Sequence, residues 1–446
     1  MENEQILEQK FQDIEATIVE PIDTSQFKPL SPQELMDILG LTIKKDEENK
    51  IVTFLCELSA YTENCQFNIS FNAPSSTGKS FIPTEIAKLF PQEDIIEMAY
   101  CSPTAFFHEV GEPDPNRKGH ILIDLSRKIM IFLDQPHAQL LERLRPILSH
   151  DKKEVTVKIT DKAQKQGMRT KNITLRGYPS VIFCTAGLKI DEQEATRFLL
   201  LSPEVNQDKI RQGISEVIRK ESDNQKYSDW LNENPERQLL KDRIRAIKEA
   251  DIKEVKIINE QYIRERFFSD NKSLKPRHQR DIKRVLAIIK SLALLNLWWR
   301  EKDGSTITAN EEDIEEGFKI WDKISVSQEH NLPPYVYDLF KEVIMPAWEE
   351  KDIGMASGGL TRQEILQKHY AVYGRTLDGN QLRQQILPML ETTGLVSQEP
   401  DRDDKRRMLV YPNIPASSSV ENNSESEGGV KSDDANLEEA LDILAS

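Results

Sequence analysis

Apolar and polar positions alternate along the chain in two distinct ways. Between about residues 65 and 203, short runs with a strand period take turns with runs that have a helical period. The run 129–134 ends in an acid after five apolar residues, and 180–185 is also mostly apolar, as buried strands are. This alternation predicts an α/β domain with a parallel sheet over residues 31–204.

Beyond residue 204 the helical period dominates. Residues 204–275 are charged and predicted to be helical, although their periodicity is poor. In residues 277–297, apolar residues recur at helical spacing, and the first residues of the segment are rich in arginine and lysine. Together with a short strand and helix that follow, they predict a helical lid over 205–330.

The layout of residues 331–413 predicts a separate winged-helix domain. Thr361 and Glu364 form a capping box before one helix, a second helix follows, and a charged hairpin closes the unit. Pro388 is expected to shorten or kink the second helix. The residues predicted to contact DNA are Gln381, Arg383, Gln384, Arg406 and Arg407. A protein contact is an open alternative, because residues 361–413 carry eight bases and seven acids, a net charge of only +1.

Both ends of the chain are acidic. Residues 1–25 carry seven acids and one lysine, and 414–446 carry eight acids and one lysine, so the two ends hold −13 of the total charge of −16. We expect an acidic helical arm over 1–30 and a disordered tail over 414–446. Leu437, Leu441 and Leu444 share a helical face in that tail, which predicts either a docking peptide or a frayed end.

The composition excludes several classes of protein. Hydrophobic residues make up 38% and charged residues 30% of the chain, and no apolar run is long enough to span a bilayer. The acidic start lacks the layout of a signal peptide, so a cytoplasmic protein without a membrane partner is expected. Four scattered cysteines and seven dispersed histidines predict neither a disulfide framework nor a zinc site.

A small-residue loop between a predicted strand at 65–71 and a predicted helix at 81–90 carries the main chemical signal. The loop consists of Ala73, Pro74, Ser75, Ser76, Thr77, Gly78, Lys79 and Ser80. Strand, loop, Gly-Lys-Ser and helix is the context of a phosphate-binding loop, although Ala73 replaces the usual first glycine. Its N–H groups would hold the β-phosphate of ATP, Lys79 would reach the β- and γ-phosphates, and Ser80 would bind Mg²⁺.

Three polar residues further along fit the same site. Asp134, at the end of the apolar run 129–134, would bind the Mg²⁺ directly or through water. Thr185 ends the next predicted strand and could contact the γ-phosphate or the attacking water. Arg197 stands just before another apolar run, where either a surface arginine or a nucleotide contact is possible.

Residues 151–178 predict a basic hairpin. They hold eight bases and three acids, a net charge of +5, and two strand-like runs flank a lysine-rich tip. The predicted contacts with a phosphate backbone are Lys158, Lys162, Lys165 and Arg169. An ordinary solvated hairpin with edge lysines is the alternative.

With these motifs in order, residues 65–413 resemble an AAA+ ATPase of the minichromosome-maintenance (MCM) helicase type. The likeness is greatest to short MCM-like ATPases in the replication modules of plasmids, phages and mobile elements. The resemblance implies that 151–178 is a pre-sensor-1 hairpin and that Thr185 stands at sensor 1, usually Asn. It also implies that Arg197 is an arginine finger offered to a neighbouring subunit, and that Arg280, with Arg277 as the alternative, is sensor 2.

Two departures from this family stand out. Gln135 follows Asp134 where the family has a glutamate, and an amide can orient water but cannot accept its proton. Glu142 could substitute only if the fold brings it close. About sixty residues replace the family's large N-terminal tier, so a partner protein is expected to supply that function. A primase or another replication protein is the partner expected at the acidic termini.

The resemblance implies an ATP- and Mg²⁺-dependent translocase or helicase that acts on single-stranded or forked DNA as a ring, with a hexamer expected. One rival reading is an ATP-gated assembly factor with slow hydrolysis, which loads a helicase or recruits a primase. Another is a transcription regulator that binds DNA through its winged helix.

Overall fold

A parallel sheet of five strands forms the centre of the computed structural model. The structure describes residues 22–413 except 64, 100, 103–105, 107–110, 162–168, 186–196, 272 and 354–357. The strands follow the order β2 (Ile95–Met98), β5 (Ile129–Phe132), β8 (Ser180–Thr185), β1 (Asn68–Asn72) and β9 (Leu199–Leu201). Every neighbouring pair is parallel, as the sequence predicted.

Alternate residues of these strands supply two apolar faces. Ile129 and Ile131 of β5 belong to one core, and Met130 and Phe132 to the other. The first core is covered by α3 (Glu47–Ser59) and α12 (His278–Leu295), and the second by α6 (Ala138–Leu148). Burial on both faces is why β5 and β9 are continuously apolar and β8 nearly so, whereas β1 alternates apolar residues with buried polar ones.

Short elements flank the sheet. They are η1 (Thr24–Gln26), α2 (Pro32–Leu39), α4 (Phe81–Ala87) and η2 (Gln92–Asp94). Ser31 and Glu34 form a capping box at the start of α2. The helix after the phosphate loop is shorter than the predicted 81–90.

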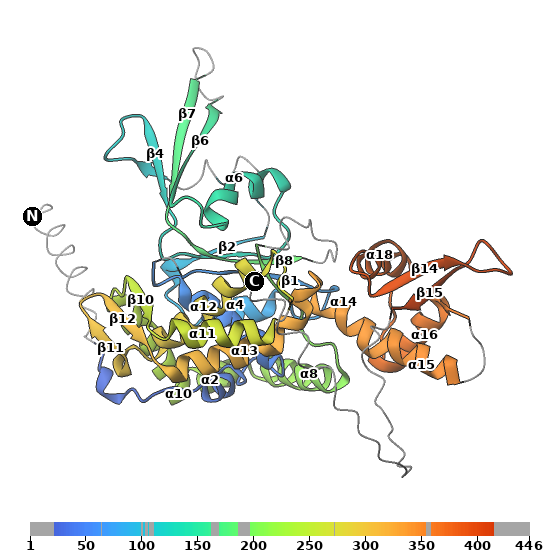
Figure 1. Cartoon of the computed structure of the whole chain (residues 1–446). Coiled ribbons are helices and arrows are strands. Elements are labelled where there is room, and N and C mark those ends of the chain that lie inside the picture. Colours follow the sequence, from blue (N-terminus) through green and yellow to red (C-terminus); the bar gives the residue numbers. More distant parts are fainter. Residues whose placement is uncertain are drawn as a thin grey trace, which may run out of the picture. The chain divides into compact units, whose positions relative to one another are not determined.

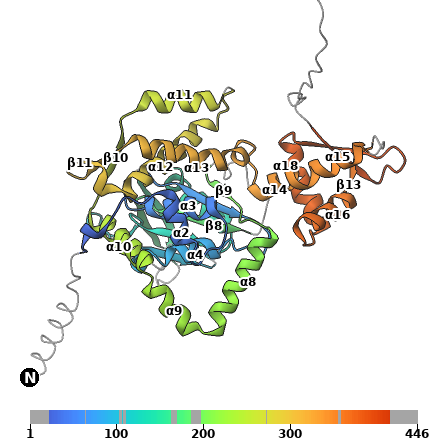
Figure 2. The same cartoon turned by 90° about the horizontal axis from the view of Figure 1, so that it is seen from below.

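The region predicted to be a helical lid also contains a small sheet. Its helices are α8 (Gln207–Ser222), α9 (Asn224–Glu233), α10 (Pro235–Glu249), α11 (Glu260–Asp270), α12, η3 (Leu297–Trp299) and α13 (Glu311–Glu329). The strands lie in the order β10 (Glu254–Ile257), β12 (Thr306–Ala309) and β11 (Glu301–Asp303). Only β12 was predicted: β11 is short, charged and exposed, and β10 alternates charged and apolar residues over only four positions, with Val255 buried. Figure 2 shows α8 and α9 on the side of the core opposite α11.

The predicted basic hairpin belongs to a four-stranded sheet. β6 (Glu154–Asp161) and β7 (Arg169–Arg176) pair antiparallel, and β4 (His120–Asp124) pairs with β7. β3 (Glu112–Pro113) completes the order β3-β4-β7-β6. Figure 1 shows this sheet rising beside α6, away from the central sheet.

The last part of the described chain combines helices with a three-stranded sheet. The helical elements are α14 (Pro334–Leu339), the π-turn η4 (Phe340–Ile344), α15 (Met345–Ile353), α16 (Arg362–Tyr373), α17 (Gly379–Gln381), the π-turn η5 (Leu382–Ile386) and α18 (Leu387–Thr392). β13 (Leu360–Thr361), β15 (Met408–Pro412) and β14 (Val396–Pro400) form a sheet in that order. The capping box of Thr361 and Glu364 is present.

Pro388 interrupts the second helix as expected, and the structure shows how. The π-turn η5 ends two residues before it, and Pro388 stands in the first turn of α18. Proline has no N–H and its ring crowds the carbonyl four residues earlier, which a wider π-turn relieves. η4 stands in the same position relative to Pro346 of α15. Among the described residues, no helix is both long and apolar enough to cross a bilayer.

Candidate functional site

The predicted phosphate loop joins β1 to α4 at the carboxyl edge of the central sheet. Gly78 has a φ of +92°, a conformation that side-chain-bearing residues rarely adopt, and a Cβ there would meet nothing within 4 Å. Ala73 is fully buried and does not have a positive φ, which explains why alanine can replace the first glycine of the usual phosphate-loop pattern. Lys79 and Ser80 are half-buried, and the Ser80 side chain caps no helix N–H.

A lysine that sequence reasoning missed holds this loop from outside. Lys209, in the first turn of α8, donates its Nζ to the Thr77 carbonyl (3.2 Å) and the Glu204 carbonyl (3.1 Å). It also forms an ion pair with the buried carboxylate of Asp46. In a trans peptide the C=O and the next N–H point in opposite directions. Holding the Thr77 carbonyl therefore directs the Gly78 N–H to the other side of the loop.

Three predicted residues meet at the same edge of the sheet. Thr185 ends β8 opposite Asn72, and its carbonyl accepts the Ala73 N–H (3.4 Å) where the loop begins. The Thr185 hydroxyl donates to the Gln135 side-chain oxygen (3.3 Å). Asp134 follows β5 and is exposed, with its Oδ1 accepting the Gln135 N–H (2.8 Å). Carboxyl ends of neighbouring parallel strands are where α/β proteins bind ligands.

Cys184 connects these groups to the loop. Its thiol lies 3.3 Å from the Lys79 carbonyl. Burial raises the pKa of Cys184 to about 12, the charge of Lys79 opposes that rise, and the charges of Glu97 and Asp134 add to it. Lys79 and Asp134 therefore both lie within electrostatic range of one buried thiol.

The residues at this edge fit a Mg²⁺–nucleotide complex. Asp134 keeps one carboxylate oxygen outside its bond to the Gln135 N–H, and the Ser80 hydroxyl lies at the start of α4. Hydroxyl and carboxylate oxygens are the ligands that Mg²⁺ prefers. Glu142, the possible substitute for a catalytic glutamate, is exposed on α6 and makes no hydrogen bond or ion pair with a described residue.

The predicted arginines lie in a different pocket, where β1 begins. Arg197 donates its Nε to the Ser149 hydroxyl (2.9 Å), and it lines this pocket with Arg280, Lys283 and Arg284. Residues 66–68 line the pocket too, whereas the phosphate loop begins after residue 72. At ~3.3 Å per residue, the length of β1 alone separates the two places by roughly 13 Å.

The pocket distinguishes Arg280 from its alternative. Arg277 is almost buried and bonds Asp281 through Nε (2.7 Å) and Asn331 through a terminal nitrogen (2.8 Å), which is a structural role. Arg280 is exposed and faces the pocket. Its placement favours Arg280 as the residue that would contact a ligand. Burial lowers the pKa of His150, in the same pocket, to about 4, so the ring is neutral at pH 7.

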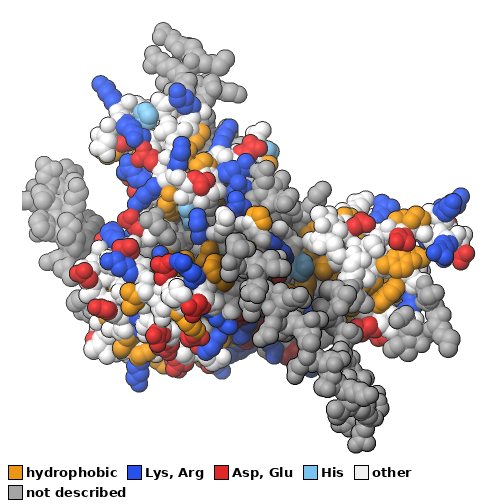
Figure 3. Space-filling view, in the orientation of Figure 1, with side chains coloured by type: hydrophobic (Ala, Val, Ile, Leu, Met, Phe, Trp, Pro, Cys, Tyr) orange, Lys and Arg blue, Asp and Glu red, His pale blue; other side chains and the backbone are white. Residues whose placement is uncertain are grey.

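The hairpin predicted to bind DNA is described only in its strands. Lys158 is exposed on β6, Arg169 opens β7, and Lys162 and Lys165 lie outside the described residues. Arg117 and Lys118, which sequence reasoning missed, are exposed in the turn between β3 and β4. Figure 3 shows Lys and Arg side chains over this part of the molecule. The signal for the two missed residues was their position in a short turn before a strand.

The predicted groove-binding residues are distributed over the C-terminal helices and hairpin. Arg383 and Gln384 are exposed in η5, and Gln381 is half-buried at the end of α17. Arg406 and Arg407 are exposed in the turn between β14 and β15. Residues 1–21 of the arm predicted over 1–30, and the tail at 414–446, lie outside the described residues.

These features define a mixed α/β protein whose five-stranded parallel sheet is consistent with a P-loop fold. No protein-family profile and no curated protein sequence matches the chain. Its structure is similar to that of a full-length MCM homolog from Methanopyrus kandleri, with a TM-score of 0.38 and 14% sequence identity. The match covers 66% of this chain but only 60% of that protein, less than two thirds of its length. A TM-score and a sequence identity this low carry no functional inference.

Proposed function

We propose that the chain is an ATP-dependent DNA translocase or helicase of the AAA+ class, related to MCM helicases and active as a ring. The observation that carries this proposal is the separation of two half-sites. Lys79, Asp134 and Thr185 gather at the carboxyl edge of the sheet, and Arg197 and Arg280 share a pocket beyond the other end of β1. A head-to-tail contact between two copies would join the two half-sites.

The order of the strands supports an AAA+ type of P-loop core. The strand before the phosphate loop, β1, has the Thr185 strand as its neighbour, and the Asp134 strand comes next. In this arrangement a polar side chain stands between the loop and the acid. The Thr185 hydroxyl would orient Gln135, and Gln135 would orient the attacking water.

Each residue of the two half-sites would have a distinct role. The loop N–H groups and Lys79 would hold the phosphates in line with the water. When bound between Ser80 and Asp134, Mg²⁺ would neutralise charge on the phosphate oxygens. Arg197 and Arg280 of the next copy would stabilise the charge that develops during phosphoryl transfer.

We further propose that the basic sheet and the C-terminal domain contact DNA. Lys158, Arg117 and Lys118 offer exposed cations on β6 and on the β3–β4 turn. Residues 360–412 would act as a winged helix, in which Arg383 and Gln384 would face a groove and Arg406 and Arg407 would lie on the wing.

The test is DNA-stimulated ATPase activity together with unwinding of a forked duplex. The Lys79→Ala variant is the control, and it should lose both activities. Equal turnover by the wild-type protein and this variant would refute the ATPase proposal.

Gln135 favours one second candidate, an ATP-gated assembly factor. Its amide is held by Thr185 but has no basic group to accept a proton from water. A protein of this kind would bind DNA tightly with ATP and hydrolyse it slowly. ATP-dependent DNA binding without strand displacement would support this function over the helicase.

A further inference from the structure

Helix α8 presents an apolar stripe to solvent. Ile210, Ile214, Val217 and Ile218 are 41%, 55%, 60% and 58% exposed, and no residue of the helix is buried. Their spacing places all four on one helical face. Single exposed apolar residues are normal in proteins, but a stripe of four at helical spacing is typical of a surface that docks another element.

The helix that carries the stripe is anchored on its other faces. Glu216 pairs with Lys44 (3.2 Å) and accepts the Tyr227 hydroxyl (2.8 Å). The guanidinium of Arg219 lies 3.6 Å from the centre of the Trp230 ring. In the first turn, Lys209 holds the phosphate loop through the Thr77 carbonyl. The stripe therefore begins directly beside the candidate nucleotide site.

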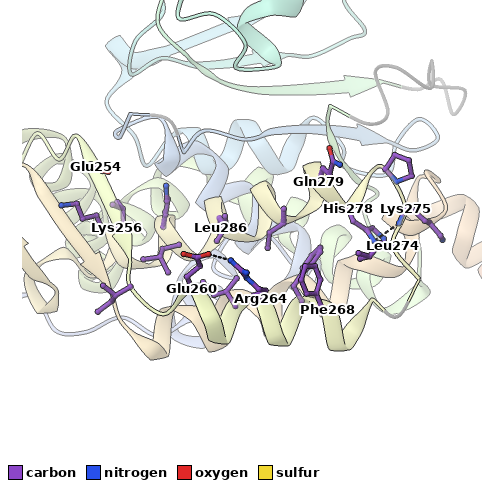
Figure 4. Close-up of a pocket in the computed structure, with 18 residues that line it drawn as sticks. Glu254, Lys256, Glu260, Arg264, Phe268, Leu274, Lys275, His278, Gln279 and Leu286 are labelled. Carbon is purple, nitrogen blue, oxygen red and sulfur yellow. Dashed lines mark hydrogen bonds and ion pairs between the residues drawn. The ribbon is translucent and has the colours of Figure 1, made fainter. Parts of the chain in front are cut away.

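A groove on α11 and α12 offers a surface of matching chemistry. It has a volume of about 1050 Å³ and lies between these helices and the edge strand β10. Ile263, Phe267, Ile282 and Leu286 line it, and Ile258 and Phe268 are 76% and 52% exposed at its sides. Figure 4 shows the side chains of α11 and α12 converging on this space.

The groove adjoins the pocket of Arg197 and Arg280. Gln279, Ile282 and Leu286 of α12 face the groove, whereas Arg280, Lys283 and Arg284 of the same helix line the arginine pocket. Each half-site thus has an apolar neighbour. The phosphate loop stands beside α8, and the arginine pocket stands beside the groove.

We infer that the apolar stripe of α8 docks in the α11–α12 groove of a second copy of this chain. The inference rests on the proposed sharing of the nucleotide site, because the same contact would bring Arg197 and Arg280 to the neighbour's phosphate loop. α8 and α11 lie on opposite sides of the core (Figure 2), so the contact is head-to-tail and can repeat around a ring.

The dimensions agree with this contact. Ile210 to Ile218 spans roughly 12 Å of helix, and α11 is roughly 16 Å long at ~1.5 Å per residue. Gly213 borders the stripe, and a Cβ there would meet nothing within 4 Å in the chain itself. A glycine in mid-helix is unfavourable to the helix, but it allows another backbone to come close.

The experiment measures the mass of assemblies formed by the full chain with Mg²⁺ and a non-hydrolysable ATP analogue. Ile214→Glu should raise the dissociation constant for self-association about a hundredfold, because docking would bury a charge in an apolar groove. Ser215→Glu adds the same charge one residue away, roughly 100° around the helix and outside the four-residue stripe, and should assemble as the wild type does. Gly213→Leu should weaken assembly without disturbing the monomer.

A mixing experiment tests the pairing of the two surfaces. Phe268→Glu should block the groove, so that this variant and Ile214→Glu are each monomeric alone. Mixed, they retain one intact stripe and one intact groove, and they should form dimers but no larger species. If the mixture stays monomeric, or if Ile214→Glu assembles normally, the inference is wrong.

Binding of the ATP analogue is measured on the same samples to separate this inference from the proposed function. Monomeric Ile214→Glu should still bind the analogue through its own phosphate loop, and Lys79→Ala should not. Normal binding with unaltered assembly of Ile214→Glu would overturn the docking contact and leave the proposed function in place. Absence of binding by the wild type would contradict the proposed function, and a wild type that stays monomeric with bound analogue would overturn the docking contact.

Discussion

Gln135→Glu is the substitution that most directly tests whether residue 135 lies beside the attacking water. The Gln135 side-chain oxygen accepts the Thr185 hydroxyl at 3.3 Å and stands next to Asp134. A glutamate oxygen can accept the same hydrogen bond, so the new side chain keeps the existing orientation. The change therefore adds a proton acceptor without removing the contact that positions it.

The expected effect follows from the environment of the side chain. A positioned general base contributes about 10²–10⁴-fold to a rate. Gln135 is exposed in a single copy, so an introduced carboxylate would be ionised and only weakly basic at neutral pH. We therefore expect the lower end, about a hundredfold faster hydrolysis, which corresponds to ~2.7 kcal/mol of barrier at ~1.36 kcal/mol per tenfold.

The assay is single-turnover hydrolysis of radiolabelled ATP by the assembled protein with DNA. A single turnover removes any limit set by product release. Thr185→Val in the Gln135→Glu background should lose much of the gain, because it removes the donor that orients the side chain. An unchanged rate in Gln135→Glu, with ATP binding intact, would refute the assignment of Gln135 to the water-binding position.

Three further predictions follow from the contacts described. Lys209→Met leaves the buried Asp46 carboxylate without its ion-pair partner. The variant should therefore lower the free energy of unfolding by about 3 kcal/mol in urea titrations, and it should weaken ATP binding. Adding Asp46→Asn to this variant should restore part of the stability. Arg197→Ala and Lys79→Ala should each be inactive, yet their mixture should recover ATPase activity. About a quarter of the interfaces in the mixture would join the intact phosphate loop of one variant to the intact arginine of the other. No recovery would contradict a shared site. The pKa of His150 is lowered from 6.5 to about 4 in the folded chain, so the unfolded chain takes up the proton first as the pH falls. The free energy of unfolding should therefore fall by on the order of 3 kcal/mol between pH 6.5 and 4. His150→Phe should remove this pH-dependent loss.

The sequence was most informative where a local rule applies. Apolar runs predicted the central strands β5 and β8, because burial on both faces favours apolar residues at nearly every position. The capping box at Thr361 predicted a helix start, because a cap depends on residues three apart. The same rules missed β10 and β11, whose few charged residues are held in a sheet by β12.

The candidate site could be predicted only in its parts. The Gly78-Lys79-Ser80 sequence is recognisable because a phosphate loop needs a particular backbone, and the positive φ of Gly78 agrees with it. The contact between Thr185 and Gln135 joins residues fifty positions apart and depends on which strands are neighbours. Lys209 has no sequence signal, because its role arises from the distant partners Thr77 and Asp46.

The sequence by itself determined the residue types that each segment carries: a loop with the sequence pattern of a phosphate-binding loop, an acid after a buried strand, and arginines and lysines in separate basic segments. Only the tertiary structure decided how these groups are divided in space. It placed the loop, Asp134 and Thr185 at one edge of the sheet, and Arg197 and Arg280 beyond the other end of β1. The physical reason is that parallel strands gather their carboxyl ends at one edge, whereas α12 packs where the amino end of β1 begins. The spacing of residues along the chain does not predict at which edge of the sheet a residue will lie.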